Sequence, residues 1–140
     1  MKFYSKIFAV SLLILFFCCA DVSAQTKQKI LLKNARGEAG KAVAGKVKGT
    51  LQGDAYRDLI FSVPKGRAAD ITLYPSPENA PLMFDLIAPN GKVLEKGIGD
   101  FLDELDAPGT YTIRVYMLKE DADIKRPAKA SFTVTIFMYI

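Results

Sequence analysis

The feature that most constrains this chain is an alternating run of side chains that follows a turn at Pro108 and Gly109. Proline fixes φ and glycine tolerates φ > 0, so the pair is typical of a tight turn. Apolar or aromatic side chains then occupy every second position, at Tyr111, Ile113, Val115 and Met117. Because successive side chains of a strand point to opposite faces, the run predicts a strand with one buried face, placed centrally in a sheet.

A second run of the same character extends from Ser131 to Tyr139, after a charged connection from Lys119 to Lys129. We expect the two strands to lie together in one side of a β-sandwich. The loops beside them are expected to carry the function, because binding residues concentrate in loops on a rigid scaffold.

The rest of the sequence contains short apolar runs separated by glycine and proline at intervals of about 8–12 residues. Strands are expected at 29–33, 43–48, 56–63, 69–74, 82–86 and from 93, with a loop over 34–45 and either a strand or a helical turn at 100–105. Asn90-Gly91 is a strong hairpin signal before the strand from 93. The pattern predicts an all-β fold, a single antiparallel β-sandwich (jelly-roll-like) of about eight strands.

The inward-facing positions of these runs predict the hydrophobic core. The expected core residues are Leu59, Phe61, Ile71, Leu73, Phe84, Leu86, Tyr111, Ile113, Val115, Phe132, Val134 and Ile136.

The N-terminus has the three parts of a signal peptide. Lys2 and Lys6 are basic, residues 7–20 are apolar, and small residues at 22–24 offer a cleavage site. The apolar run is too short for a comfortable membrane span and has no stop-transfer flank. An alternative is lipoprotein processing, with acylation of Cys18 or Cys19.

Cleavage divides the chain into a signal peptide, residues 1–24, and a β-sandwich domain, residues 25–140, that is periplasmic or secreted and has no membrane span. The whole chain has 19 basic and 15 acidic residues, and the signal peptide removes two basic and one acidic, which leaves a net charge of +3. This excess is too small to indicate a nucleic-acid partner. Both cysteines leave with the signal peptide, so the domain is expected to have no disulfide and no thiolate metal site.

The composition argues against an enzyme, and we expect no cofactor and no metal site. The sequence has no histidine, which removes the commonest general base, and it has no G-x-S-x-G or phosphate-loop motif. The acidic segment from Asp100 to Asp106 is expected to be a solvated turn, with calcium binding or acid/base chemistry as the alternatives. Asp54, Asp58 and Asp85 are expected to be turn or surface residues.

Two features are open to a structural or a functional interpretation. The charged connection from Lys119 to Lys129 is either a solvated hairpin loop that protects a sheet edge or a protruding recognition loop. Tyr56 either caps the core or stands at the rim as an amphipathic anchor for a partner.

Five segments carry a resemblance to a known module: 45–49 (GKVKG), 56–58 (YRD), 61–66 (FSVPKG), 89–91 (PNG) and 107–115 (APGTYTIRV). They resemble the bacterial pre-peptidase C-terminal domain, a β-sandwich that is usually appended to secreted proteases. This resemblance implies a carbohydrate- or cell-wall-binding module, with peptidoglycan as a possible partner. Such a module would need a flat face of exposed aromatic residues, for which the candidates are Tyr74, Tyr116, Phe137 and Tyr139.

A sharper resemblance rests on Gly109, Tyr111 and Arg114-Val115, on the short loop over 117–122 and on the final strand over 132–136. These residues resemble the periplasmic inhibitors of g-type lysozyme, which are small exported proteins without a catalytic domain. The resemblance implies that rim loops plug the substrate cleft of a lysozyme.

The loop differs from the pattern of that family, which carries arginines where this chain has Lys119 and Asp123. The residues expected to contact the partner are Tyr56, Lys119, Lys125 and Arg126.

Overall fold

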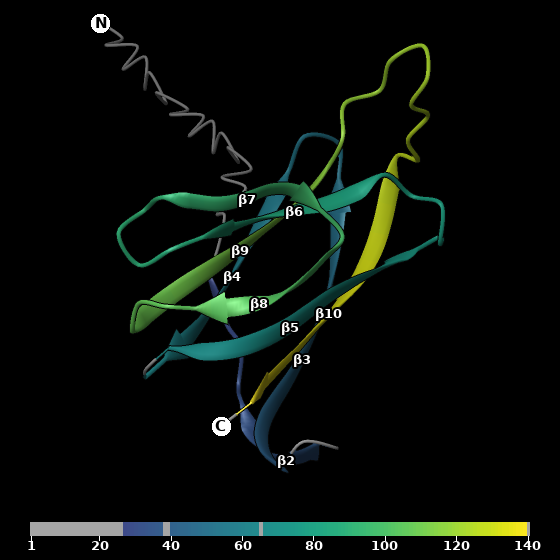
Figure 1. The fold of residues 1–140 in the computed structure, drawn as a ribbon. Coiled ribbons are helices and arrows are strands. Elements are labelled where there is room, and N and C mark those ends of the chain that lie inside the picture. The colour runs from purple at the N-terminus through teal and green to yellow at the C-terminus, as the bar shows by residue number, and fades with distance from the viewer. Residues whose placement is uncertain (1–26, 38–39, 65, 140) are drawn as a thin grey trace, which may run out of the picture.

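The computed structural model describes residues 27–37, 40–64 and 66–139. The proposed signal peptide, with Cys18 and Cys19, lies outside these residues. The described chain forms two sheets of five strands that pack face to face (Figure 1). It contains no helix that is long and apolar enough to cross a membrane. The predicted β-sandwich is therefore confirmed.

The two sheets are named A and B here, with their strands given in spatial order. Sheet A contains β1 (Gln28–Lys29), β4 (Tyr56–Val63), β9 (Gly109–Met117), β6 (Leu82–Ile87) and β7 (Val93–Ile98). Sheet B contains β2 (Lys33–Gly37), β3 (Gly40–Gln52), β10 (Lys129–Tyr139), β5 (Arg67–Ser76) and β8 (Asp100–Leu105). All described pairs are antiparallel except β1 with β4, which is parallel. The sandwich thus has ten described strands where about eight were expected, and one short pair, β1 with β4, is parallel.

The two strongest strands lie in opposite sheets, which corrects the expectation that they share one side. β9 is the middle strand of sheet A, and β10 is the middle strand of sheet B (Figure 1). The segment between them therefore crosses from one sheet to the other and is not a hairpin. Alternation shows that each strand has one buried face, but it carries no information on which sheet the strand joins.

The N-terminal part is more regular than the sequence indicates. The expected strand at 29–33 is mostly the link between β1 and β2, and the expected loop at 34–45 is the β2–β3 hairpin. Glycine at position 45 is required by the close packing of this link, because a Cβ there would lie 2.7 Å from Ile30 Cγ2. The small residues that looked like a loop instead allow the link to pass close to β3.

The core lies between the two sheets and contains every residue that the sequence placed there. The rings of Phe61 and Tyr111 stack with their centroids 5.7 Å apart. The Tyr111 hydroxyl donates a hydrogen bond to the carbonyl oxygen of Ala107 at 2.7 Å, so its polar end is satisfied at the rim. The same bond holds the turn before β9 against the core.

Candidate functional site

The outer face of sheet A carries an ion pair between its two longest neighbouring strands. Asp58 of β4 lies opposite Arg114 of β9. The guanidinium donates through Nε to Oδ1 at 2.8 Å and through Nη2 to Oδ2 at 3.0 Å. Asp58 is only 4% exposed, so the prediction of a turn or surface residue was wrong for this position. The carboxylate can be buried because the Arg114 guanidinium donates a hydrogen bond to each of its two oxygens, in place of water.

Tyr56 lies on this outer face beside the ion pair, and not in the core. The Arg114 guanidinium carbon stands 4.5 Å from the centre of the Tyr56 ring, in a cation–π contact. The hydrogen bond that Arg114 donates to Asp58 raises the pKa of Arg114 above its ordinary value, against an opposing effect of burial. Arg114 therefore stays charged and fixes the position of the Tyr56 ring.

Asp85 of β6 extends the polar network on the other side of β9. It accepts hydrogen bonds from the Tyr116 hydroxyl at 2.9 Å and from the backbone N–H of Gly97 at 2.8 Å. Burial, together with the hydrogen bond to Asp85, raises the pKa of Tyr116 to about 12. Asp85 therefore joins β6, β7 and β9 at the surface of sheet A, a role that the sequence did not indicate.

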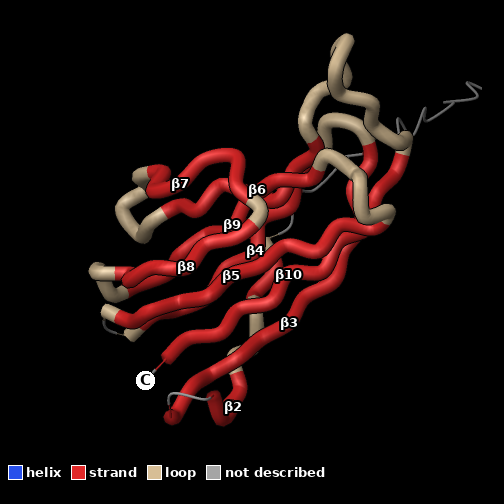
Figure 2. The backbone as a smooth tube through the Cα atoms, turned by 45° about the vertical axis from the view of Figure 1, so that its right-hand side comes forward, coloured by secondary structure: helices blue, strands red, loops and turns tan. Residues whose placement is uncertain are grey.

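The connection between β9 and β10 forms a structured loop that projects from one end of the sandwich (Figure 2). Asp121 accepts hydrogen bonds from the backbone N–H groups of Asp123 and Ile124, both at 2.8 Å. The N–H of Leu118 donates to the carbonyl oxygen of Pro81 at 2.9 Å. These contacts close the loop on itself and attach its base to sheet A.

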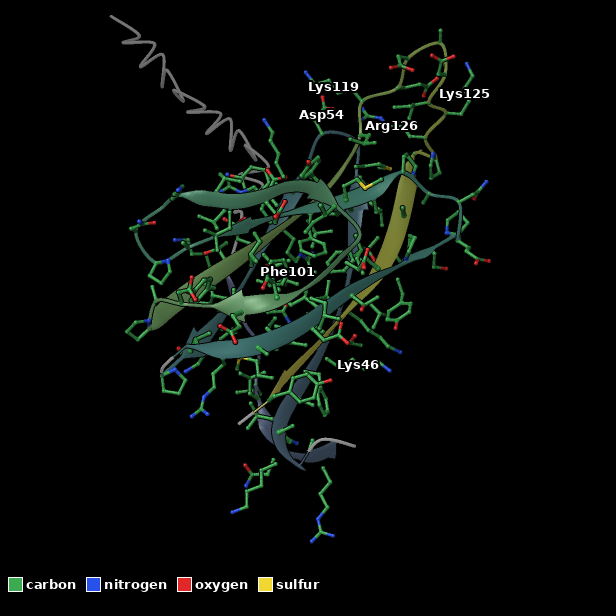
Figure 3. The ribbon with its side chains drawn as sticks, viewed as in Figure 1. Lys46, Asp54, Phe101, Lys119, Lys125 and Arg126 are labelled. Carbon is green, nitrogen blue, oxygen red and sulfur yellow. The ribbon has the colours of Figure 1, made fainter. Side chains whose placement is uncertain are left out.

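Arg126 attaches the far side of the loop to the β3–β4 turn. Its guanidinium donates to Asp54 Oδ1 at 2.9 Å, and the side chain is only 18% exposed. Figure 3 shows Asp54 and Arg126 together at the base of the loop, with Lys125 further out. Arg126 therefore positions the loop, in addition to any contact that it makes with a partner.

The loop and the outer face of sheet A enclose a hollow of about 520 Å³. It is lined by Asp54, Tyr56, Arg114, Tyr116, Met117, Leu118, Lys119, Asp121 and Ile124. Two of the four predicted contact residues, Tyr56 and Lys119, lie in this lining. Lys125 is exposed on the loop outside it, and Arg126 holds the loop in place.

The sequence reasoning did not select Arg114 and Tyr116 as lining residues. The one signal in the sequence is that they alternate with the buried residues of β9, so both face outward from sheet A. That signal does not show which other residues lie beside them. What brings them to the hollow is the pairing of β9 with β4, which sets Tyr116 opposite Tyr56.

The acidic segment at 100–106 is mostly a strand, one of the two alternatives expected for 100–105, and not a solvated turn. Residues 100–105 form β8, the edge strand of sheet B. Within the described residues, no group of three or more His, Cys, Asp or Glu side chains is arranged to hold a metal ion.

The four aromatic candidates for a flat sugar-binding face do not share one surface. Tyr74 of β5 and the pair Phe137 and Tyr139 of β10 belong to sheet B, whereas Tyr116 belongs to sheet A. Tyr74 is 55% exposed, and Phe137 and Tyr139 contact each other edge to face with ring centroids 5.0 Å apart. The arrangement therefore does not form a single platform from all four rings.

The fold is shared with two kinds of known protein. PliG from Aeromonas hydrophila, a periplasmic lysozyme inhibitor of g-type lysozyme, matches with a TM-score of 0.61 and 18% identity over 81% of this chain and 98% of that one. A mutant PliG from Escherichia coli matches with a TM-score of 0.50 and 16% identity over 81% of this chain and 100% of that one. The pre-peptidase C-terminal domain of a Bacillus anthracis collagenase matches with a TM-score of 0.52 and 16% identity over 79% of this chain and 94% of that one.

These likenesses confirm, at the level of the fold, both resemblances read from the sequence. Comparison with protein-family models gives no match, and comparison with curated protein sequences gives none either.

Proposed function

We propose that this protein is an exported, non-enzymatic inhibitor of a lysozyme, and that the hollow beside the β9–β10 loop is its inhibitory surface. The observation that carries the proposal is the anchored loop, which is held away from the sandwich with Tyr56 and Lys119 at its base. The fold shared with periplasmic inhibitors of g-type lysozyme supports the class of partner. The predicted signal peptide supports a periplasmic location.

The loop is suited to occlusion because it is both projecting and ordered. A segment that is already held in its bound shape loses less conformational entropy on binding than a flexible one. The Asp121 turn and the Arg126–Asp54 bond supply that order without any contribution from a partner. Insertion of such a loop into a cleft blocks the substrate and requires no chemistry.

The exposed charge on the loop suits a glycoside-hydrolysing cleft. Such clefts generally contain a pair of catalytic carboxyl groups. Lys119 and Lys125 are exposed, and neither forms an ion pair with any described residue. Their ammonium groups are therefore available for carboxylates of the partner, while Tyr56 offers an amphipathic ring of the kind enriched in interfaces.

The direct test is inhibition of g-type, c-type and i-type lysozymes by the purified protein, with Lys119→Glu measured beside it. We expect selective inhibition of the g-type enzyme. The charge reversal should weaken inhibition by about tenfold or more, because it replaces an attraction with a repulsion.

A matched control is Lys46→Glu, on β3 of sheet B and outside the hollow (Figure 3). It makes the same change in net charge and should leave inhibition unchanged. Equal weakening by both variants would mean that net charge matters and the loop does not. Full activity of all three lysozyme classes at micromolar excess of the protein would contradict the proposal itself.

A further inference from the structure

A second hollow, larger than the first, lies between the free edges of the two sheets. β7 is the last strand of sheet A and β8 is the last strand of sheet B, and Gly99 alone joins them. The groove between them has a volume of about 630 Å³ and shares no lining residue with the hollow beside the loop. It is therefore a separate feature of the molecule.

The floor of the groove is apolar. Phe101 of β8 packs partly against the core, and Figure 3 shows it in the space between β8 and sheet A. Leu94 of β7 is 39% exposed beside the groove, and the buried Tyr111 is also part of its lining. Apolar surface left open in this way favours burial against a partner.

The two edges differ in how well they can accept another strand. β8 pairs with β5 in uninterrupted register from Asp100 to Leu105. The register of β7 with β6 shifts twice, which marks bulges. Bulges disturb the row of backbone groups that an added strand would need, so β8 is the better suited of the two edges. On β8 the backbone N–H of Glu104 donates to Asp103 Oδ1 at 2.7 Å, and an added strand would have to replace this contact.

The net charge of the groove lining is negative, whereas that of the chain as a whole is positive. Its lining contains four carboxylates, Glu95, Asp103, Glu104 and Asp106, and a single lysine, Lys92. None of these carboxylates forms an ion pair with any described residue. The whole chain nevertheless carries a net charge of +4. The groove is thus an acidic region on a basic protein, and it complements a cationic partner.

We propose that this groove binds an extended basic segment of a partner protein, which adds a strand to the edge of β8. Backbone hydrogen bonds to β8 would provide affinity, and side chains of the segment would alternate between the groove and solvent. Apolar side chains on one face of the segment cover Phe101 and Leu94. Lysines or arginines on its other face pair with Glu104, and Asp103 adds to the local negative charge. This site is independent of the lysozyme-inhibitor proposal, because its residues lie outside that surface.

The test uses a defined probe, the peptide acetyl-Lys-Val-Lys-Val-Lys-Val-Lys-amide, titrated into the full-length protein and followed by amide chemical shifts in NMR. We expect the largest shifts at the amides of 100–105. Asp103→Asn with Glu104→Gln should weaken binding by about tenfold, as expected for loss of charged hydrogen bonds. Glu120→Gln with Asp123→Asn makes the same charge change on the β9–β10 loop and should leave the affinity within about twofold.

A second peptide separates strand addition from simple attraction of charge. N-methylation of every residue blocks the backbone donors on both edges of the peptide and keeps every charge, so it should abolish binding if the peptide pairs with β8. Three results would each overturn the proposal. They are binding of the methylated peptide as tight as that of the unmethylated one, chemical shifts centred on the β9–β10 loop, and an unchanged affinity in the Asp103/Glu104 variant. Self-association of the protein that the peptide does not displace would also overturn it, since a second copy would then be the occupant.

Discussion

Two arginine–aspartate pairs within the described residues have almost the same bond length and very different surroundings. Arg114 and Asp58 meet at 2.8 Å, with an aspartate side chain that is 6% exposed, and Arg126 and Asp54 meet at 2.9 Å, with one that is 76% exposed. The first pair joins two strands of sheet A, and the second joins a loop to a turn. One residue of each pair, Arg114 and Asp54, lines the same hollow.

The two pairs have different roles, because one stabilises the fold and the other positions the loop. A buried carboxylate that loses its partner keeps the cost of desolvation, so the Arg114 pair is needed for the fold. An exposed carboxylate that loses its partner is hydrated at once, so the Arg126 pair contributes little to stability. What the Arg126 pair supplies is the position of the loop.

Arg114→Ala should have the largest effect on stability. We expect the free energy of unfolding to fall by about 2 kcal/mol. The Asp58 carboxylate loses both hydrogen bonds, and the surrounding side chains allow water to hydrate it only in part. Urea denaturation measures the change. Arg114→Lys is the control and should recover only part of the loss, since an ammonium group cannot form the same fork. A loss no greater than that of Arg126→Ala would remove the distinction between the two pairs.

Alkaline pH tests the buried network without changing the loop. The pKa of Tyr116 is raised in the folded protein from 10.0 to about 12, so the folded state holds this proton more tightly than the unfolded state. The resulting stability is complete below pH 10 and is lost as the pH rises toward about 12. Urea midpoints at pH 9 and pH 11.5, compared with those of Tyr116→Phe, measure it. Parallel decline of the two proteins above pH 10 would argue against a contribution from this group.

Arg126→Ala should have the smallest effect on stability. We expect the free energy of unfolding to change by no more than about 0.5 kcal/mol, because the pair is solvated on the aspartate side. Hydrogen exchange of the loop amides over 118–128 should nevertheless become faster, and inhibition of lysozyme should weaken. Lys125→Ala serves as the control, since its side chain is exposed on the same loop. Unchanged exchange in Arg126→Ala would show that the Asp121 turn holds the loop without help.

The strands with strong alternation were predictable because burial of one face leaves a period of two in the sequence. This is why the core residues of β4, β5, β6, β9 and β10 were found without a structure. The β2–β3 hairpin was missed for the converse reason. Its glycines and alanines carry no period, and at Gly45 the small residue is needed because a Cβ there would lie 2.7 Å from Ile30 Cγ2.

The candidate site was predictable only in part. Tyr56 and Lys119 were selected from residue type and from loop position, and both line the hollow. Asp58 was misjudged, because a single aspartate in a strand gives no indication of a partner 56 positions away. Arg126 was selected as a contact residue, and its bond to Asp54 adds a positioning role that spans 72 positions of sequence.

The sequence by itself determined the all-β class, the buried face of each strong strand and the shortage of catalytic groups, because these depend on composition and on local periodicity. Only the tertiary structure decided that β9 and β10 lie in opposite sheets and that Arg114 pairs with Asp58. It also decided that the edge strands β7 and β8 border a groove with four carboxylates in its lining. Those features depend on which strands become neighbours, and strand pairing follows from the packing of the whole chain.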